Sequence, residues 1–175
     1  MKSPIYLILI LMLCLNVHAA DWDTSETIRT SGGELHYRVS GTGKPLLLLH
    51  GYSGYGEQWR NFLDEFANSY RVIAVDLPGH GQSSKLRGSF VISDAARDMW
   101  QLMDLLGVKQ IYGVGYSAGG MTLLQMALQE PSRVKSLVLA ASAFTVVEDH
   151  SAEPFELLPE AYRQDLLRNH NGDME

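Results

Sequence analysis

The chain has 175 residues, of which 46% are hydrophobic and 19% are charged, a balance typical of one globular domain with an apolar core. Its formal net charge of −6 argues against a nucleic-acid partner, because nucleic-acid-binding domains carry a basic surface. Neither property predicts an oligomeric state.

The first 19 residues have the anatomy of a secretory signal peptide. Lys2 gives a positive start, residues 5–15 form an apolar run, and Val17-His18-Ala19 fits a cleavage site. The run is too short to span a bilayer comfortably. We therefore expect an exported, periplasmic or secreted protein with no stable membrane association after cleavage, and an uncleaved anchor is the alternative.

Cysteine chemistry is absent from the expected mature chain. Cys14 is the only cysteine of the sequence, and it lies within the leader. The mature protein should therefore have neither a disulfide nor a cysteine ligand for a metal. We predict no metal site and no cofactor.

Beyond the leader, the apolar pattern predicts a mainly parallel sheet. Two short alternating stretches predict an antiparallel hairpin around Ser31-Gly32-Gly33, and continuous apolar runs predict strands that are buried on both faces. The hairpin strands are expected at 28–30 and 35–39, and the buried strands at 45–49, 72–75, 111–116 and 134–140.

Helical patterns alternate with these strands. Trp59, Phe62, Leu63 and Phe66 have helical spacing, a second helix is expected from an N-cap at Ser93 to Leu106 with Gly107 at the C-cap position, and a third from Ala118 to Gln129. Strands that alternate with helices predict an α/β fold with helices on both faces of the sheet.

The segment Gly115-Tyr116-Ser117-Ala118-Gly119 carries the chemistry. It matches Gly-x-Ser-x-Gly between a predicted strand and a predicted helix, where a tight turn exposes the serine hydroxyl and requires the small residues Gly115 and Gly119. Ser117 is the candidate nucleophile. The backbone N–H groups of Ala118 and of Tyr52, in His50-Gly51-Tyr52, are the candidate oxyanion donors.

The same stretch fits a second pattern. Residues 113–118 also match Gly-x-Gly-x-x-Ala, the dinucleotide fingerprint. That fold requires an acidic residue at the end of the next strand to bind the ribose, and the next predicted strand ends Leu139-Ala140-Ala141-Ser142. We therefore favour the nucleophile turn.

Three motifs in order resemble the α/β-hydrolase fold-1 family over about residues 24–144. These motifs are His50-Gly51-Tyr52 followed by Trp59, the loop Asp76-Leu77-Pro78-Gly79-His80-Gly81-Gln82-Ser83, and Gly115 to Gly120. The resemblance implies hydrolysis of a small-molecule acyl substrate without a cofactor, as in esterases, lactonases and proline iminopeptidases. It also implies that the 76–83 loop braces the serine turn and that His50 shapes the oxyanion loop.

The rest of the triad is not identifiable. The family order is serine, acid, histidine, whereas only His150 and His170 follow Ser117, and neither they nor Asp149 resembles the family's catalytic loop. We expect an N-terminal hydrolase core at 24–147 without the last two strands and helices of the sheet, followed by the start of a cap at 148–175 with a short helix at 158–167.

Two functions follow from this pattern. The first is an exported serine hydrolase that acts on an ester or related acyl bond through Ser117. The alternative is a catalytically inactive remnant or a ligand-binding protein. In either case, the predicted strand around Leu137-Val138-Leu139 would form an unprotected sheet edge.

Overall fold

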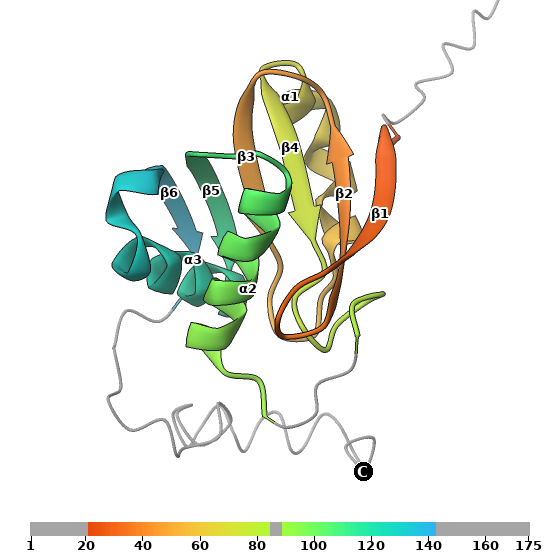
Figure 1. The fold of residues 1–175 in the computed structure, drawn as a ribbon. Coiled ribbons are helices and arrows are strands. Elements are labelled where there is room, and N and C mark those ends of the chain that lie inside the picture. Colours follow the sequence, from red (N-terminus) through yellow and green to blue (C-terminus); the bar gives the residue numbers. More distant parts are fainter. Residues whose placement is uncertain (1–20, 85–88, 143–175) are drawn as a thin grey trace, which may run out of the picture.

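A computed structural model describes residues 21–84 and 89–142 (Figure 1). The predicted leader and the predicted cap region, with its helix at 158–167 and with Asp149, His150 and His170, lie outside the described residues. The part that is described contains nearly all of the predicted core.

The described strands form one mixed sheet. Its strand order is β1-β2-β4-β3-β5-β6, in which β1 pairs antiparallel with β2, β2 pairs antiparallel with β4, and the remaining pairs are parallel. The predicted α/β class and mainly parallel sheet are therefore confirmed. The strands are β1 (Thr24–Arg29), β2 (Glu34–Ser40), β3 (Lys44–Leu49), β4 (Tyr70–Val75), β5 (Ile111–Tyr116) and β6 (Val134–Ala140).

Helices cover both faces of the sheet because the central strands are apolar on both sides. Leu47 and Leu49 of β3 join the core under α2 (Ile92–Leu105) and α3 (Ala118–Gln129), whereas Leu46 and Leu48 join the core under η1 (Gly56–Phe62) and α1 (Leu63–Ala67). Figure 1 shows α2 and α3 in front of the sheet and α1 behind it.

The expected N-cap of one helix was wrong, and a second helical segment is of mixed type. The segment around Trp59 begins as a 3-10 helix and becomes α-helical only at Leu63. The helix expected to start at Ser93 has Val91 at its N-cap position, where the carbonyl of Val91 accepts bonds from the N–H groups of Asp94 and Ala95. No side chain caps this end, so the turn is closed by backbone bonds alone.

Two further boundaries moved by a few residues. The first hairpin strand is longer than expected and ends before Thr30, whose N–H closes the turn onto the carbonyl of Gly33. Leu106 occupies the C-cap of α2, and Gly107 follows it with φ +70°. This left-handed backbone is the conformation for which glycine is favoured after a helix.

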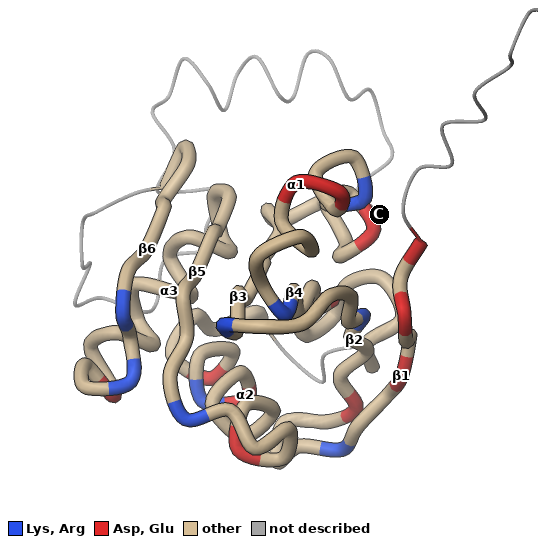
Figure 2. Tube along the Cα trace, turned by 90° about the horizontal axis from the view of Figure 1, so that it is seen from above, with Lys and Arg blue, Asp and Glu red and all other residues tan. Residues whose placement is uncertain are grey.

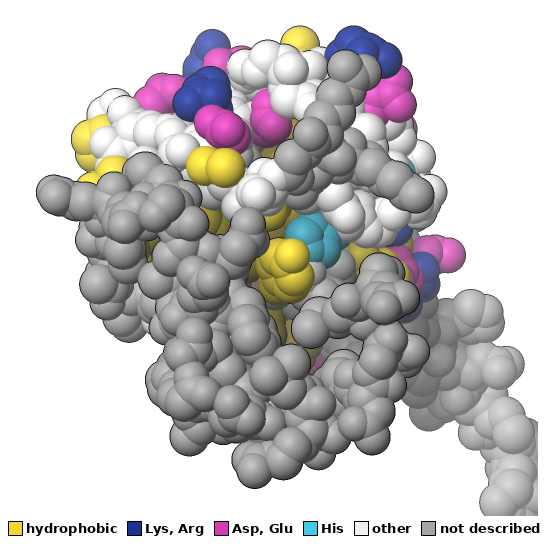
Figure 3. Space-filling view, turned by 90° about the horizontal axis from the view of Figure 1, so that it is seen from below, with side chains coloured by type: hydrophobic (Ala, Val, Ile, Leu, Met, Phe, Trp, Pro, Cys, Tyr) yellow, Lys and Arg dark blue, Asp and Glu magenta, His cyan; other side chains and the backbone are white. Residues whose placement is uncertain are grey.

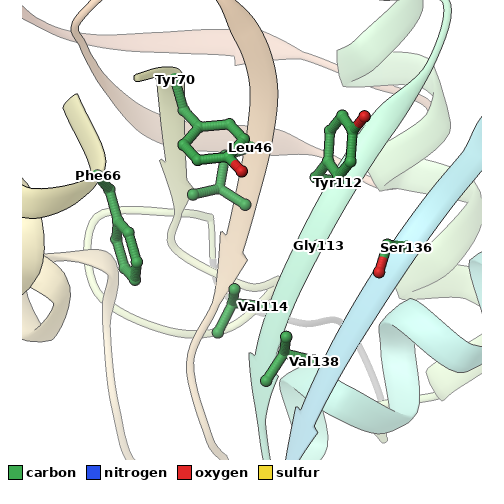
Figure 4. Close-up of a pocket in the computed structure, with 8 residues that line it drawn as sticks. All are labelled: Leu46, Phe66, Tyr70, Tyr112, Gly113, Val114, Ser136 and Val138. Carbon is green, nitrogen blue, oxygen red and sulfur yellow. The ribbon is translucent and has the colours of Figure 1, made fainter. Parts of the chain in front are cut away.

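The 134–140 strand is not buried on both faces, and it lies at the sheet edge that the sequence predicted around Leu137-Val138-Leu139. Strand β6 lies at the edge of the described sheet, and the side chain of Val138 is 59% exposed. Beside it, a hollow of about 230 Å³ lies on the α1 side of the sheet (Figure 4). Its lining is mostly apolar and consists of Leu46, Phe66, Tyr70, Tyr112, Gly113, Val114, Ser136 and Val138.

Charged positions of both signs occur in the described part of the chain. Lysine and arginine positions are spread over the described elements, and acidic positions gather along β1 (Figure 2). Within residues 21–84 and 89–142, no helix is long and apolar enough to cross a membrane, and no three His, Cys, Asp or Glu side chains form a group that could hold a metal ion.

Candidate active site

Ser117 lies on a strained turn between β5 and α3. Its backbone has φ 49° and ψ −116°, and it is one of two non-glycine residues with positive φ in the described chain. Two backbone bonds hold the turn: the N–H of Ser117 donates to the carbonyl of Ala140 at 2.9 Å, and the N–H of Met121 donates to the carbonyl of Ser117 at 3.1 Å. Strain of this kind persists only where the surrounding structure enforces it.

The glycines on either side of Ser117 are required by close backbone contacts. A Cβ atom at Gly115 would lie 2.6 Å from the backbone N of Gly120, and one at Gly119 would lie 2.3 Å from the carbonyl O of Leu49. Both distances are below van der Waals contact with atoms that cannot move away. The turn therefore fits against β3 and α3 only because both positions lack a side chain.

The loop after β3 packs against this turn. A Cβ atom at Gly51 would lie 2.8 Å from the ring of Tyr116 and 3.4 Å from Cβ of Ser117. The amides of Tyr52 and Ala118 donate no hydrogen bond to another residue of the described part. Both donors thus remain available beside the serine, and that of Ala118 opens helix α3.

The imidazole of His50 is hydrogen-bonded to both loops at this site. Its Nε2 accepts a hydrogen bond from the N–H of Leu77 at 2.9 Å, so its proton sits on Nδ1, which donates to the carbonyl of Gly51 at 2.6 Å. The ring is fully buried, and burial lowers the pKa of His50 to about 4. His50 is therefore neutral and links the loop after β3, at Gly51, to the loop after β4, at Leu77.

Asp76, at the end of β4, holds the same loops from the other side. Its carboxylate accepts bonds from the N–H of Gly56 at 2.6 Å, the N–H of Gln82 at 2.9 Å and the guanidinium of Arg38 at 2.9 Å. Burial alone would raise the pKa of Asp76, but these bonds outweigh it and hold the pKa below its usual range. The carboxylate is ionised and serves to brace the fold.

Aromatic side chains gather next to the loop that carries Tyr52. The ring of His80 meets those of Tyr52 and Phe90 edge to face, with centroids 5.4 and 5.7 Å apart, and Tyr52 is 60% exposed. Figure 3 views the side of the molecule at which the parallel strands end, where a histidine surface lies beside hydrophobic side chains. Such a rim suits an apolar group.

No base contacts Ser117 in the described part. Its hydroxyl forms no hydrogen bond there, and the described histidines His36, His50 and His80 are bound elsewhere. The turn at Ser117 and the loop at His50-Gly51-Tyr52 lie together, whereas His150 and His170 lie outside the described residues. The arrangement holds a positioned hydroxyl and two amide donors.

The polar face of β2 is buried, which its alternating pattern did not predict. His36, Arg38 and Ser40 lie inside the protein on one face of this strand. The alternation of polar residues could have predicted this, because polar residues at alternate positions of a strand that is covered on both faces need polar partners inside the protein. Asp76 is the partner of His36 and Arg38.

This strand order, with a strained serine between a parallel strand and a helix, defines the class of α/β folds with a nucleophile turn. A family model described as the alpha/beta hydrolase fold matches residues 44–174. The chain belongs to the α/β-hydrolase fold family. The serine turn follows β5, not a first strand, and the dinucleotide interpretation of residues 113–118 is set aside.

Proteins of known sequence and structure are similar to this chain. It is 39% identical over 126 residues to a protein named putative carbamate hydrolase RutD of Variovorax paradoxus, covering 70% of this chain and 47% of the relative. It is 38% identical over 144 residues to the 2-hydroxy-6-oxononadienedioate/2-hydroxy-6-oxononatrienedioate hydrolase of Paraburkholderia phymatum, covering 77% and 50%.

The fold of this chain is also similar to that of a solved hydrolase structure. The N-acyl homoserine lactonase AidH, in complex with N-hexanoyl homoserine, superposes with a TM-score of 0.64 at 32% identity, covering 68% of this chain and 45% of that chain. The chain spans about half the length of these three relatives or less.

Proposed function

We propose that this protein is a serine hydrolase that cleaves an ester or related acyl bond through Ser117. The observation that carries the proposal is the strained backbone of Ser117, near which the amides of Tyr52 and Ala118 donate no hydrogen bond within the described residues. Ser117 attacks the carbonyl carbon, and the N–H groups of Tyr52 and Ala118 stabilise the developing oxyanion. The similar proteins named as a carbamate hydrolase and a lactonase support this reaction class.

A serine hydroxyl needs a histidine base, and a carboxylate orients that base. We place both groups outside the described residues, because no described histidine contacts Ser117. The same observation favours a second candidate function, a non-catalytic remnant or a ligand-binding protein. In that case the aromatic rim around Tyr52 would hold an acyl ligand without cleaving it.

An ester-hydrolysis assay separates the two functions. The chain, its Ser117→Ala variant and a matched Ser132→Ala variant are compared on p-nitrophenyl butyrate over many turnovers. A hydrolase shows turnover in the wild type and in Ser132→Ala that falls to the buffer rate in Ser117→Ala. Wild-type turnover equal to that of Ser117→Ala would exclude a catalytic role for Ser117 in this chain.

Export is the second part of the proposal. Lys2, the apolar run at 5–15 and Val17-His18-Ala19 support a cleaved leader. In a bacterial expression host, we expect the mature chain in the periplasm or medium, with an N-terminus near Ala20. Recovery of the intact leader in the membrane fraction would instead favour an anchor.

A further inference from the structure

A second serine carries the relay that Ser117 lacks in the described part of the chain. The Oγ of Ser25 lies 2.9 Å from Nε2 of His36, and Nδ1 of His36 lies 3.1 Å from Oδ2 of Asp76. These contacts join a hydroxyl, an imidazole and a carboxylate in one line. The same three groups, in the same order, form the relay that activates the serine of a hydrolase triad.

The protonation of the three groups can be assigned from their surroundings. The ionised carboxylate of Asp76 can only accept, so the proton of His36 sits on Nδ1. Burial, together with the nearby guanidinium of Arg38, lowers the pKa of His36, and Asp76 offsets only part of this effect. The imidazole is neutral at pH 7, and its free Nε2 accepts the hydroxyl proton of Ser25.

His36 and Asp76 are buried and held by hydrogen bonds, whereas the hydroxyl of Ser25 is exposed. Only 3% of His36 is exposed, and its backbone N–H donates to Oγ of Ser83 at 2.9 Å, while that hydroxyl donates to the carbonyl of Asp76. Asp76 is fully buried under four hydrogen bonds. Ser25, by contrast, lies exposed on β1, the outermost strand, where a reagent can reach it.

We propose that Ser25 is a second nucleophile of this protein, which His36 activates and Asp76 orients, and that activated acyl esters acylate it. The oxygen of Ser25 bonds to the carbonyl carbon, its proton passes to Nε2 of His36, and the bond to the leaving group breaks. The leaving alcohol or phenol takes the proton from His36, so the products are O-acyl Ser25 and the free alcohol.

This site should be acylated once and not turn over. Ser25 lies within a strand, whereas Ser117 stands at the N-terminus of α3, so Ser25 has no helix terminus to stabilise the oxyanion of either step. The good leaving group of an activated ester makes up for this in the first step, whereas O-acyl Ser25 is an ordinary alkyl ester and persists. The proposal is independent of the function proposed for Ser117.

Site-resolved acetylation by p-nitrophenyl acetate tests the proposal in the Ser117→Ala background. Peptide mass spectrometry follows Ser25 and, as the matched control, the exposed Ser132. We expect Ser25 to be acetylated at least about tenfold faster, below the roughly 100-fold that general-base assistance can supply. The substitutions Ser25→Ala and His36→Gln should reduce the signal at residues 21–29 to the level of Ser132.

The pH profile tests the relay without any change to His36. With a neutral imidazole as the base, the acetylation rate of Ser25 should stay level from pH 7 to 9, whereas that of Ser132 should rise about tenfold per pH unit with its alkoxide. The charged groups that face His36 are the guanidinium of Arg38 and the carboxylate of Asp76. Parallel rises at the two serines, or equal rates, would overturn the proposal.

Discussion

Acid should destabilise this fold through His50, and the size of the effect follows from its burial. The pKa of His50 is about 4 in the folded chain, against 6.5 for an ordinary histidine. Between these values the unfolded chain binds a proton that the folded chain does not. The free energy of unfolding is therefore highest above pH 6.5 and falls as the pH drops towards 4.

The loss can be stated as a free energy. A shift of one pKa unit is worth 1.36 kcal/mol, so this one residue removes about 3 kcal/mol of stability between pH 6.5 and 4. That is a large part of the 5–15 kcal/mol that roughly bounds a domain's stability. Protonated Nε2 could no longer accept from the N–H of Leu77, so the loop that carries Tyr52 would loosen first.

Urea unfolding at steps between pH 8 and 4.5, followed by tryptophan fluorescence, measures the slope. The substitution His50→Gln should lower stability at pH 7.5 but flatten the pH dependence relative to the wild type. Val72→Ala is the matched control, since it should cost about 2 kcal/mol through a core cavity and leave the wild-type slope. Equal slopes for the wild type and His50→Gln would refute the assignment of this loss to His50.

Two further predictions concern backbone contacts and one buried donor. Gly119→Ala should lower the free energy of unfolding by more than about 3 kcal/mol or prevent folding, because its Cβ would lie 2.3 Å from the carbonyl O of Leu49. The Cβ of Gly107→Ala would meet nothing within 4 Å, so this variant should lose only about 1–2 kcal/mol through left-handed strain. Comparable melting temperatures for the two variants would contradict this reasoning. Trp59→Phe should leave the free energy of unfolding within about 1 kcal/mol of the wild type, because Nε1 of Trp59 is buried without a partner in the described part and its removal relieves an unsatisfied donor. A loss of 2 kcal/mol or more on urea unfolding would show that this N–H has an acceptor.

The sequence predicted what depends on local pattern. Apolar runs marked the buried strands because β3 and β4 are covered on both faces, and the glycines around Ser117 marked the serine turn because nothing larger fits there. The predicted class, the hairpin and the order of the elements were all confirmed.

Features that depend on distant partners were not predictable in this way. The partners of Asp76 come from positions 36, 38, 56 and 82, and no local pattern connects them. The burial of β6 depends on what lies beside the edge of the sheet and not on its own apolar residues. The start of α2 moved because the carbonyl of Val91 accepted bonds that Ser93 was expected to supply.

The positive φ of Ser117 also bears on how this gene changes over generations. A left-handed backbone costs a side-chain-bearing residue about 1–2 kcal/mol, and glycine at this position would be free of that cost. Selection for thermal tolerance alone would therefore replace Ser117 with glycine, and only selection for its hydroxyl would oppose that drift. In a library of variants selected for stability, position 117 should drift to glycine without selection for ester hydrolysis and should stay serine with it.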